Sequence, residues 1–315
     1  MHPVLFRIGE FTVATYGLAI VVGLLSCLWL VRRLAHRRHL DPNFFFDLTF
    51  LLLLSGFIGA RLFFVVLNWD FFLSDPVGVL FSRQGFVFQG GLIFALAAGI
   101  WFTRRHRIPL AETADVAAPG VALGHGFGRI GCFLAGCCFG KSAPELSEWE
   151  WLYPWLKPFL VRYPMVTDAS GEHLSRMFNF AYQAQIRQGL LEPGAGATLP
   201  LFPVQLLESA GNFLICLVLL WFWRRRRFSG QIFALYLILY SLLRFGDEFL
   251  RGDLDRGLYF NGLLSTAQII CVLTLAGGIS LWFSLRNRGI PSVPVAEGKA
   301  NPPGRRAASG ESGRK

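Results

Sequence analysis

Residues 124–141, GHGFGRIGCFLAGCCFGK, combine several side chains that can do chemistry at the end of a long apolar run. Arg129 is a permanent cation, and an arginine inside an apolar run is costly and therefore a candidate functional residue. His125 precedes it by four residues, so the two share one face of a helix. A neutral imidazole there can accept a proton. The alternative is a packing histidine bonded to a backbone carbonyl, and both interpretations remain open.

Two more arginines, Arg61 and Arg244, also lie near the ends of apolar runs, so all three can converge at one depth. The planar fork of arginine suits a phosphodiester, which predicts a pocket for an anionic phospholipid headgroup. The alternative is that each arginine reaches the membrane interface or pairs with a local acid. For Arg244 the acids are Asp247 and Glu248, three and four residues later.

A cysteine cluster, Cys132, Cys137 and Cys138, follows the arginine. No second cluster of cysteine or histidine completes a tetrahedral metal site, so no metal is predicted. A disulfide is a second possibility, and thiols that pack or face the substrate are the favoured interpretation. The other cysteines lie singly in apolar runs and are interpreted as inert core residues: Cys27, Cys216 and Cys271.

The composition is that of a membrane protein. Of 315 residues, 53% are hydrophobic and 16% are charged, whereas a soluble domain carries about 25% charged residues. The net charge of +10 comes from lysines and arginines beside the apolar runs and in the last part of the chain. That distribution indicates membrane topology and anionic lipid headgroups, and nucleic acid is not an expected partner.

Seven apolar runs predict an all-α polytopic fold with about seven transmembrane helices, at residues 17–31, 44–67, 86–102, 114–136, 205–223, 230–250 and 263–285. Basic clusters follow the first, third, fifth and seventh runs. Because basic loops stay in the cytoplasm, we expect the N-terminus outside and the C-terminus in the cytoplasm. Residues 124–141 then lie toward the outer face.

The runs also predict the domain organisation. Residues 1–285 form the membrane domain, and residues 141–200 are a polar segment at the outer face, between the fourth and fifth spans. Its tryptophans Trp149, Trp151 and Trp155 suit the headgroup level. Residues 286–315 are rich in Pro, Gly, Ser and basic residues, which predicts a disordered cytoplasmic tail.

Six pieces of the sequence carry a family resemblance, in this order: HPVLFRIGEFTVATYGLAI, GARLFFVVLNW, FQGGLI, ADVAAPGVALGHGFGRIGCFLAGCCFGK, FPVQLLES and YSLLRFGDEFLRGD. Their order and spacing on seven spans resemble the bacterial prolipoprotein diacylglyceryl transferases over residues 1–283. The resemblance implies an enzyme of the bacterial cytoplasmic (inner) membrane. It would transfer the diacylglyceryl group of phosphatidylglycerol to the lipobox cysteine of prolipoprotein signal peptides, forming a thioether and releasing glycerol phosphate. It implies no metal or soluble cofactor.

The resemblance also assigns residues. Arg129 and Arg244 match the family's two key arginines, Tyr16 an early tyrosine, and Gly140 a motif glycine. The expected catalytic residues are Arg129, Arg244, His125, Glu248 and Tyr240. The expected phosphatidylglycerol ligands are Arg129, Arg244, Arg61, Tyr16, Gln89, Gly90 and Gly140. Taken alone, polar residues such as Glu208 and Tyr240 more often make structural hydrogen bonds between helices.

Three positions depart from the family pattern. Gln89 stands where the family usually has a histidine, and glutamine cannot act as a general base. Cys132 and Cys137 stand where it usually has asparagine and an acid. Either the chemistry needs no such base, or His125 has taken over, or the chain is a paralogue with another acceptor. A membrane protein that binds or transports phospholipid without chemistry is the remaining alternative.

Overall fold

The computed structural model describes residues 4–8, 11–81, 85–165, 180–253, 257–259 and 264–287. Everything below concerns these residues. Most of the predicted tail, residues 288–315, lies outside them.

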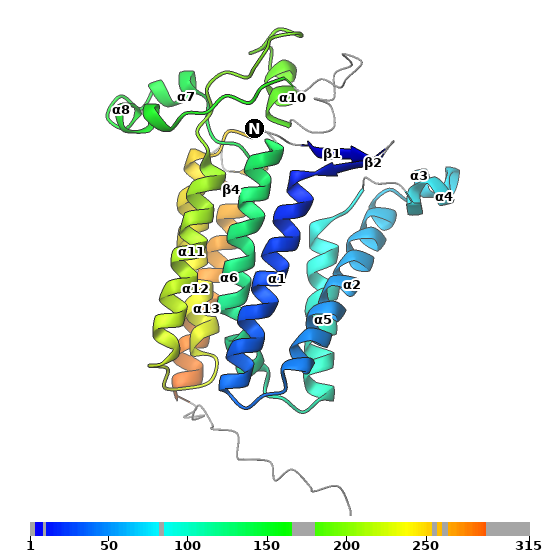
Figure 1. Cartoon of the computed structure of the whole chain (residues 1–315), viewed down its shortest axis with the longest axis vertical. Helices are drawn as coiled ribbons and strands as arrows, with labels where there is room; N and C mark the ends of the chain where they lie inside the picture. The colour runs from blue at the N-terminus through cyan, green and yellow to red at the C-terminus, as the bar shows by residue number, and fades with distance from the viewer. Residues whose placement is uncertain are drawn as a thin grey trace, which may run out of the picture.

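Seven long helices run side by side in the described part of the chain (Figure 1): α1 (Thr15–Arg37), α2 (Pro42–Leu67), α5 (Phe88–Arg105), α6 (Leu110–Ala135), α11 (Val204–Trp223), α12 (Gln231–Asp247) and α13 (Thr266–Asn287). Each coincides with one of the seven predicted apolar runs. Four of them, α1, α2, α11 and α13, are long and apolar enough to cross a membrane. The prediction of a mostly helical membrane protein is therefore confirmed.

Short elements gather at the upper end of the bundle in Figure 1, which we call the capped end. They are β1 (Val4–Ile8), β2 (Phe11–Ala14), α3 (Trp69–Ser74), α4 (Pro76–Phe81), α7 (Ala143–Ser147), α8 (Tyr153–Leu156), η1 (Lys157–Phe159), α10 (Phe180–Arg187), η2 (Glu248–Leu250), β3 (Leu258–Tyr259) and β4 (Leu264–Ser265). The strands form two antiparallel pairs, β1 with β2 and β3 with β4. These small pairs are the additions to the predicted all-α fold.

The opposite end, which we call the basic end, is where α1, α5, α11 and α13 finish (Figure 1). Basic residues occupy or follow the last turn of each of these helices: Arg37, Arg105, Arg224 and Arg286. Cations at a helix C-terminus are stabilised by the helix dipole. All four basic clusters therefore lie on one side of the molecule.

Glycines bring two pairs of helices into backbone contact. A Cβ added at Gly23 of α1 would lie 3.0 Å from the carbonyl oxygen of Gly124 in α6. A Cβ added at Gly90 of α5 would lie 2.5 Å from the carbonyl oxygen of Gly59 in α2. Small residues allow such close packing between membrane helices. Gly90 therefore packs at the crossing of α2 and α5, and its predicted contact with lipid stays a prediction.

A buried ionic group, the basic-end cluster, joins Arg38, Glu112, Asp115 and Arg226. Arg38 Nε donates to Glu112 Oε1 at 2.9 Å, and Arg226 Nη1 donates to Asp115 Oδ2 at 3.1 Å. Arg226 Nη2 also donates to Glu112. The remaining carboxylate oxygens accept bonds from the Ser229 hydroxyl and from backbone N–H groups of the α11–α12 turn and α12. Every oxygen of the two carboxylates is therefore satisfied.

Candidate functional site

The C-terminal half of α6 presents His125 and Arg129 to a single carboxylate, that of Glu208 on α11. Arg129 Nη2 lies 2.7 Å from Glu208 Oε2, and His125 Nε2 lies 3.6 Å from Glu208 Oε1. Glu208 is 1% exposed and Arg129 is 8% exposed. The predicted shared face of His125 and Arg129 is confirmed, because both side chains reach the same partner.

Helix α12 adds Tyr240 and Arg244 to this group. The Tyr240 ring centroid lies 5.2 Å from that of His125. Arg244 Nη1 donates to Glu248 Oε2 at 2.6 Å, so the alternative of pairing with a local acid is present in the structure, while the predicted contact of Arg244 with the headgroup stays a prediction. We call the six residues the capped-end cluster: His125, Arg129, Glu208, Tyr240, Arg244 and Glu248.

Several buried polar atoms of this region have no hydrogen-bond partner among the described residues. They include Nε and Nη2 of Arg129, Oε2 of Glu208 and Oδ2 of Asp247. The 2.7 Å contact between Arg129 and Glu208 is thus an ion pair without hydrogen-bond alignment. An unsatisfied buried donor costs free energy. A bound anion would satisfy the guanidinium, so the arrangement suits a phosphate.

Arg251, just after η2, extends the group toward the loops. Its Nε donates to Asp253 Oδ1 at 2.8 Å and lies 4.0 Å from Glu248 Oε2. No role for Arg251 is predicted from the sequence. The available signal was its spacing, because Arg251 follows Arg244 by seven residues and Glu248 by three, which places all three on one helical face.

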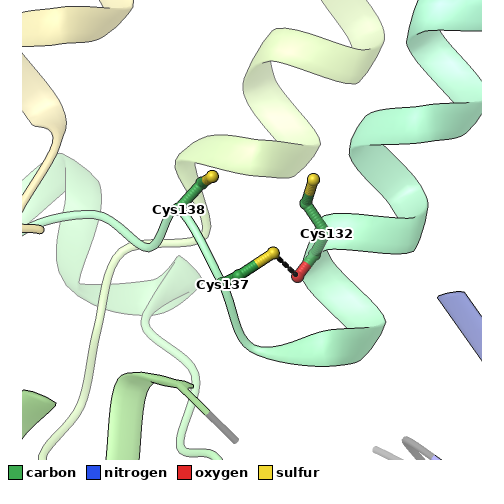
Figure 2. Close-up of side chains that lie close together, drawn as sticks. All are labelled: Cys132, Cys137 and Cys138. Atoms are coloured by element: carbon green, nitrogen blue, oxygen red, sulfur yellow. Dashed lines mark hydrogen bonds between the residues drawn. The ribbon is translucent and has the colours of Figure 1, made fainter. Parts of the chain in front are cut away.

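The chain turns back at the end of α6 and gathers three thiols (Figure 2). Gly136 adopts a left-handed conformation with φ of 67°, and the Cys137 amide donates to the Cys132 carbonyl at 3.1 Å. The Sγ atoms of Cys132, Cys137 and Cys138 all lie within 4.8 Å of one another. All six cysteines of the chain lie in the described residues, and all six are free thiols. The disulfide considered above is therefore not formed.

Comparison with known proteins identifies the family. Residues 3–284 match the family described as Prolipoprotein diacylglyceryl transferase. The chain belongs to this family.

Relatives named phosphatidylglycerol–prolipoprotein diacylglyceryl transferase align along nearly their whole length. The Stenotrophomonas maltophilia protein is 33% identical over 318 residues, covering 95% of this chain and 98% of the relative. A Clostridium perfringens protein, numbered 2 in its name, is 30% identical over 284 residues, covering 90% and 94%. The Clostridium tetani protein is 30% identical over 279 residues, covering 89% and 96%. The resemblance seen in the sequence is confirmed, and with it the assignment to the transferases.

Within this family member, Arg61 has a different environment from the other two arginines. It is 7% exposed, its Nη1 donates to the Gly85 carbonyl at 2.7 Å, and its Nη2 donates to the Val79 carbonyl. The rings of Phe64 and Phe86 lie 5.6 and 5.0 Å from its guanidinium carbon. These contacts join Arg61 of α2 to α4 and to Gly85, just before α5. They give Arg61 a structural role, and its predicted contact with the lipid headgroup stays a prediction.

Gly140 is a backbone junction. Its amide donates to the Phe202 carbonyl at 3.0 Å, and an added Cβ would lie 2.4 Å from that oxygen and 2.9 Å from the Leu250 carbonyl oxygen. Only glycine fits where three chain segments approach so closely. Gly140 therefore holds the loop that follows the cysteines.

Tyr16 and Gln89 lie on the helices beside this group. Tyr16, at the start of α1 and 41% exposed, packs its ring against Gly131 of α6, two residues from Arg129. Gln89 is exposed in the first turn of α5. Tyr16 thus borders the capped-end cluster, and its predicted contact with lipid stays a prediction, as does that of Gln89.

Proposed function

We propose that this chain transfers the diacylglyceryl group of phosphatidylglycerol to the cysteine thiol of a prolipoprotein lipobox, forming a thioether and releasing glycerol phosphate. Family membership supports the reaction. The observation that carries it is the buried Arg129, whose Nε has no hydrogen-bond partner among the described residues and whose Nη2 meets Glu208 Oε2 as an ion pair at 2.7 Å. A buried cation with spare donors suits an anionic headgroup.

In the arrangement we propose, all seven long helices span the bacterial cytoplasmic membrane, with the N-terminus and the capped end outside. The common position of the four basic helix ends supports this orientation, because basic loops are retained in the cytoplasm. The exposed indoles of Trp151 and Trp155 near the capped end suit the outer headgroup level. A signal peptide that is being exported would then meet the site at the outer face.

Arg129 and Arg244 are proposed to bind the phosphodiester and to stabilise the charge that develops on the leaving glycerol phosphate. Preorganised cations in a water-poor site contribute more than they would in water. Glu208 holds the Arg129 guanidinium in position through the ion pair at 2.7 Å. Glu248 does the same for Arg244 through the bond at 2.6 Å.

His125 is the proposed general base. Its Nε2 lies 3.6 Å from Glu208 Oε1, and that carboxylate stabilises the imidazolium formed when His125 takes the acceptor thiol's proton. The sulfur lone pair then forms a bond to the glyceryl carbon that carries the phosphate. The bond from that carbon to oxygen breaks, and its electron pair leaves with glycerol phosphate. His125 would thus do what Gln89 cannot.

The test uses the full chain, purified in detergent micelles that contain phosphatidylglycerol, and a lipobox peptide whose mass is followed. We expect a diacylglyceryl adduct, no adduct on a peptide with serine in place of the cysteine, and strong loss of transfer in Arg129→Ala. The exposed Arg37→Ala is the matched control. A folded preparation that binds the lipid without forming adduct would instead support a phospholipid-binding protein, or an enzyme with another acceptor.

His125→Ala tests the base separately. Transfer should be abolished while phosphatidylglycerol binding is retained, because Arg129 and Arg244 are intact. Transfer at the wild-type rate in this variant would remove His125 from the mechanism.

A further inference from the structure

The cluster of Cys132, Cys137 and Cys138 lies beside the residue that carries the proposed function. Arg129 Nη1 lies 3.7 Å from Cys132 Sγ. In Figure 2, Cys137 and Cys138 project from the loop after α6 on the side that faces Cys132 on the helix. The mechanism described above uses none of these thiols.

The three sulfur atoms are spaced for one thiophilic metal ion. Zinc–sulfur bonds are about 2.3 Å long, so three sulfurs around one zinc ion lie about 3.8 to 4.0 Å apart. In this chain all three Sγ atoms fall within 4.8 Å of one another. The Cys137 thiol donates to the Cys132 carbonyl oxygen at 3.6 Å (Figure 2), and it would exchange that bond for the metal.

The backbone holds the thiols in this arrangement. Cys138 has a φ of 52°, a conformation that residues with a Cβ rarely adopt. The Cys137 carbonyl accepts a bond of 2.8 Å from Gln205 Nε2, and Gln205 is fully buried in α11. The loop is therefore fixed to the helix that also carries Glu208, and the thiols are preorganised at the site.

Ligand number points to a reactive metal centre. Among the described residues, no fourth His, Cys, Asp or Glu joins the group of three. Structural zinc sites have four protein ligands, whereas catalytic sites have three and leave one position open. Three thiolates around Zn²⁺ carry a net charge of −1, and the Arg129 guanidinium, which also meets Glu208, lies beside them and is attracted to that charge.

We propose that Cys132, Cys137 and Cys138 bind one zinc ion and that the acceptor cysteine of the prolipoprotein takes its open fourth position. This inference rests on the proposed function. It assigns this family member a metal that the sequence resemblance did not imply.

Zinc coordination activates the acceptor because a metal-bound thiol is deprotonated. The proton passes to His125, the base proposed above. The zinc-bound sulfur then forms its bond to the glyceryl carbon, the bond from that carbon to phosphate oxygen breaks, and the electron pair leaves with glycerol phosphate. The thioether is a poor zinc ligand and dissociates, and zinc keeps its charge throughout. A general base at position 89 is therefore not required for this reaction.

Metal content is the first measurement. The purified full chain should contain about one zinc ion per molecule, and the triple variant Cys132→Ser, Cys137→Ser, Cys138→Ser should contain at least about tenfold less. Cys271→Ala, a buried cysteine of α13, is the matched control and should keep its zinc. Size-exclusion profiles and thermal unfolding establish that each variant is folded.

Cobalt substitution reports on the open position without catalysis. Co²⁺ in the site should give a near-ultraviolet thiolate charge-transfer band whose intensity fits three sulfur ligands. Adding a lipobox peptide should raise that intensity as a fourth thiolate binds. The same peptide with serine in place of its cysteine should leave the spectrum unchanged. If the cysteine peptide also leaves the spectrum unchanged, the proposal is wrong.

Chelation separates the inference from the proposed function. Transfer should be lost in zinc-free enzyme and restored by Zn²⁺. Zinc-free wild-type enzyme that transfers at the full rate, or a disulfide among the three cysteines of the active enzyme, overturns the proposal even if the triple variant does not fold. A chain that binds zinc and the peptide thiol but makes no adduct would leave the metal site intact and overturn only the proposed reaction.

Discussion

The two ends of the helical bundle hold buried arginine–carboxylate groups made from the same residue types, and they differ in completeness. In the basic-end cluster, Arg226 contacts both Glu112 and Asp115, and all four carboxylate oxygens accept hydrogen bonds. In the capped-end cluster, Arg129 and Glu208 meet as an ion pair without hydrogen-bond alignment, and Nε of Arg129 has no hydrogen-bond partner among the described residues.

The difference distinguishes a cluster that stabilises the fold from a cluster that can bind a ligand. A buried polar group whose donors and acceptors are all hydrogen-bonded has none left for a ligand. Its hydrogen bonds hold together the helix ends that carry it. A buried cation with unused donors destabilises the free protein and is favoured only where a ligand completes it. Buried charge alone therefore does not identify a site; the unsatisfied atoms do.

The largest expected effect is on stability at the basic end. Arg226→Ala leaves two buried carboxylates without their shared cation, which should lower the free energy of unfolding by about 3–5 kcal/mol. Thermal unfolding in detergent measures it. Arg224→Ala, an exposed neighbour, is the control and should change stability by less than about 0.5 kcal/mol. A similarly small change in the free energy of unfolding for both variants would contradict the stabilising role of the basic-end cluster.

The next prediction compares the same substitution, arginine to lysine, at the two ends of the bundle. Arg129→Lys keeps the charge but loses the fork, which should slow transfer roughly 10- to 100-fold with unfolding nearly unchanged. Arg226→Lys should instead lower stability by about 1.5–3 kcal/mol and leave transfer by the folded enzyme intact. Transfer rates and melting curves of both variants are compared. If both lose the same property, the two clusters do not differ in role.

A smaller change tests the balance within the capped-end cluster. Glu208→Gln removes the charge that offsets Arg129 and supports protonated His125. We expect KM for phosphatidylglycerol to fall and kcat to fall, each roughly fivefold, because each contact contributes about 1 kcal/mol. Steady-state kinetics with varied lipid separate the two. A KM that rises would mean that the positioning of Arg129 by Glu208 outweighs the competition of Glu208 with the phosphate for Arg129.

The smallest effect concerns Arg38, which bonds to Glu112 at the rim of the basic-end cluster and whose side chain is 19% exposed. Arg38→Ala should cost about 1 kcal/mol of stability, because Glu112 keeps its other partners. Denaturation by guanidinium chloride measures it, with the exposed Arg37→Ala as the reference. A loss as large as that of Arg226→Ala would show that the cluster acts as one unit.

The sequence alone predicted the long helices well, because each apolar run of spanning length can only bury its backbone polar groups as a helix. It also predicted that His125 and Arg129 act together, since four residues separate them on one helix. The capping elements were not predicted. Their short segments have neither a strong period nor a run of apolar residues.

The site was predicted only in part, because helical spacing reports neighbours on one helix and not across helices. Glu208 looked structural by itself, and its pairing with Arg129 depends on how α6 packs against α11. Arg61 resembled Arg129 as a rare arginine near the end of an apolar run, yet it donates to the backbone carbonyls of Val79 in α4 and of Gly85. The cysteines were set aside for want of a fourth ligand, although an open position is what a catalytic zinc site needs.

The contact between Gly59 and Gly90 has a consequence for how lipid travels. With backbone against backbone at this crossing, no space for an acyl chain remains between α2 and α5 there. A phospholipid diffusing in the bilayer meets them as one continuous wall. The route to the arginines therefore passes around this wall, and alanine at position 90 would open a seam in it.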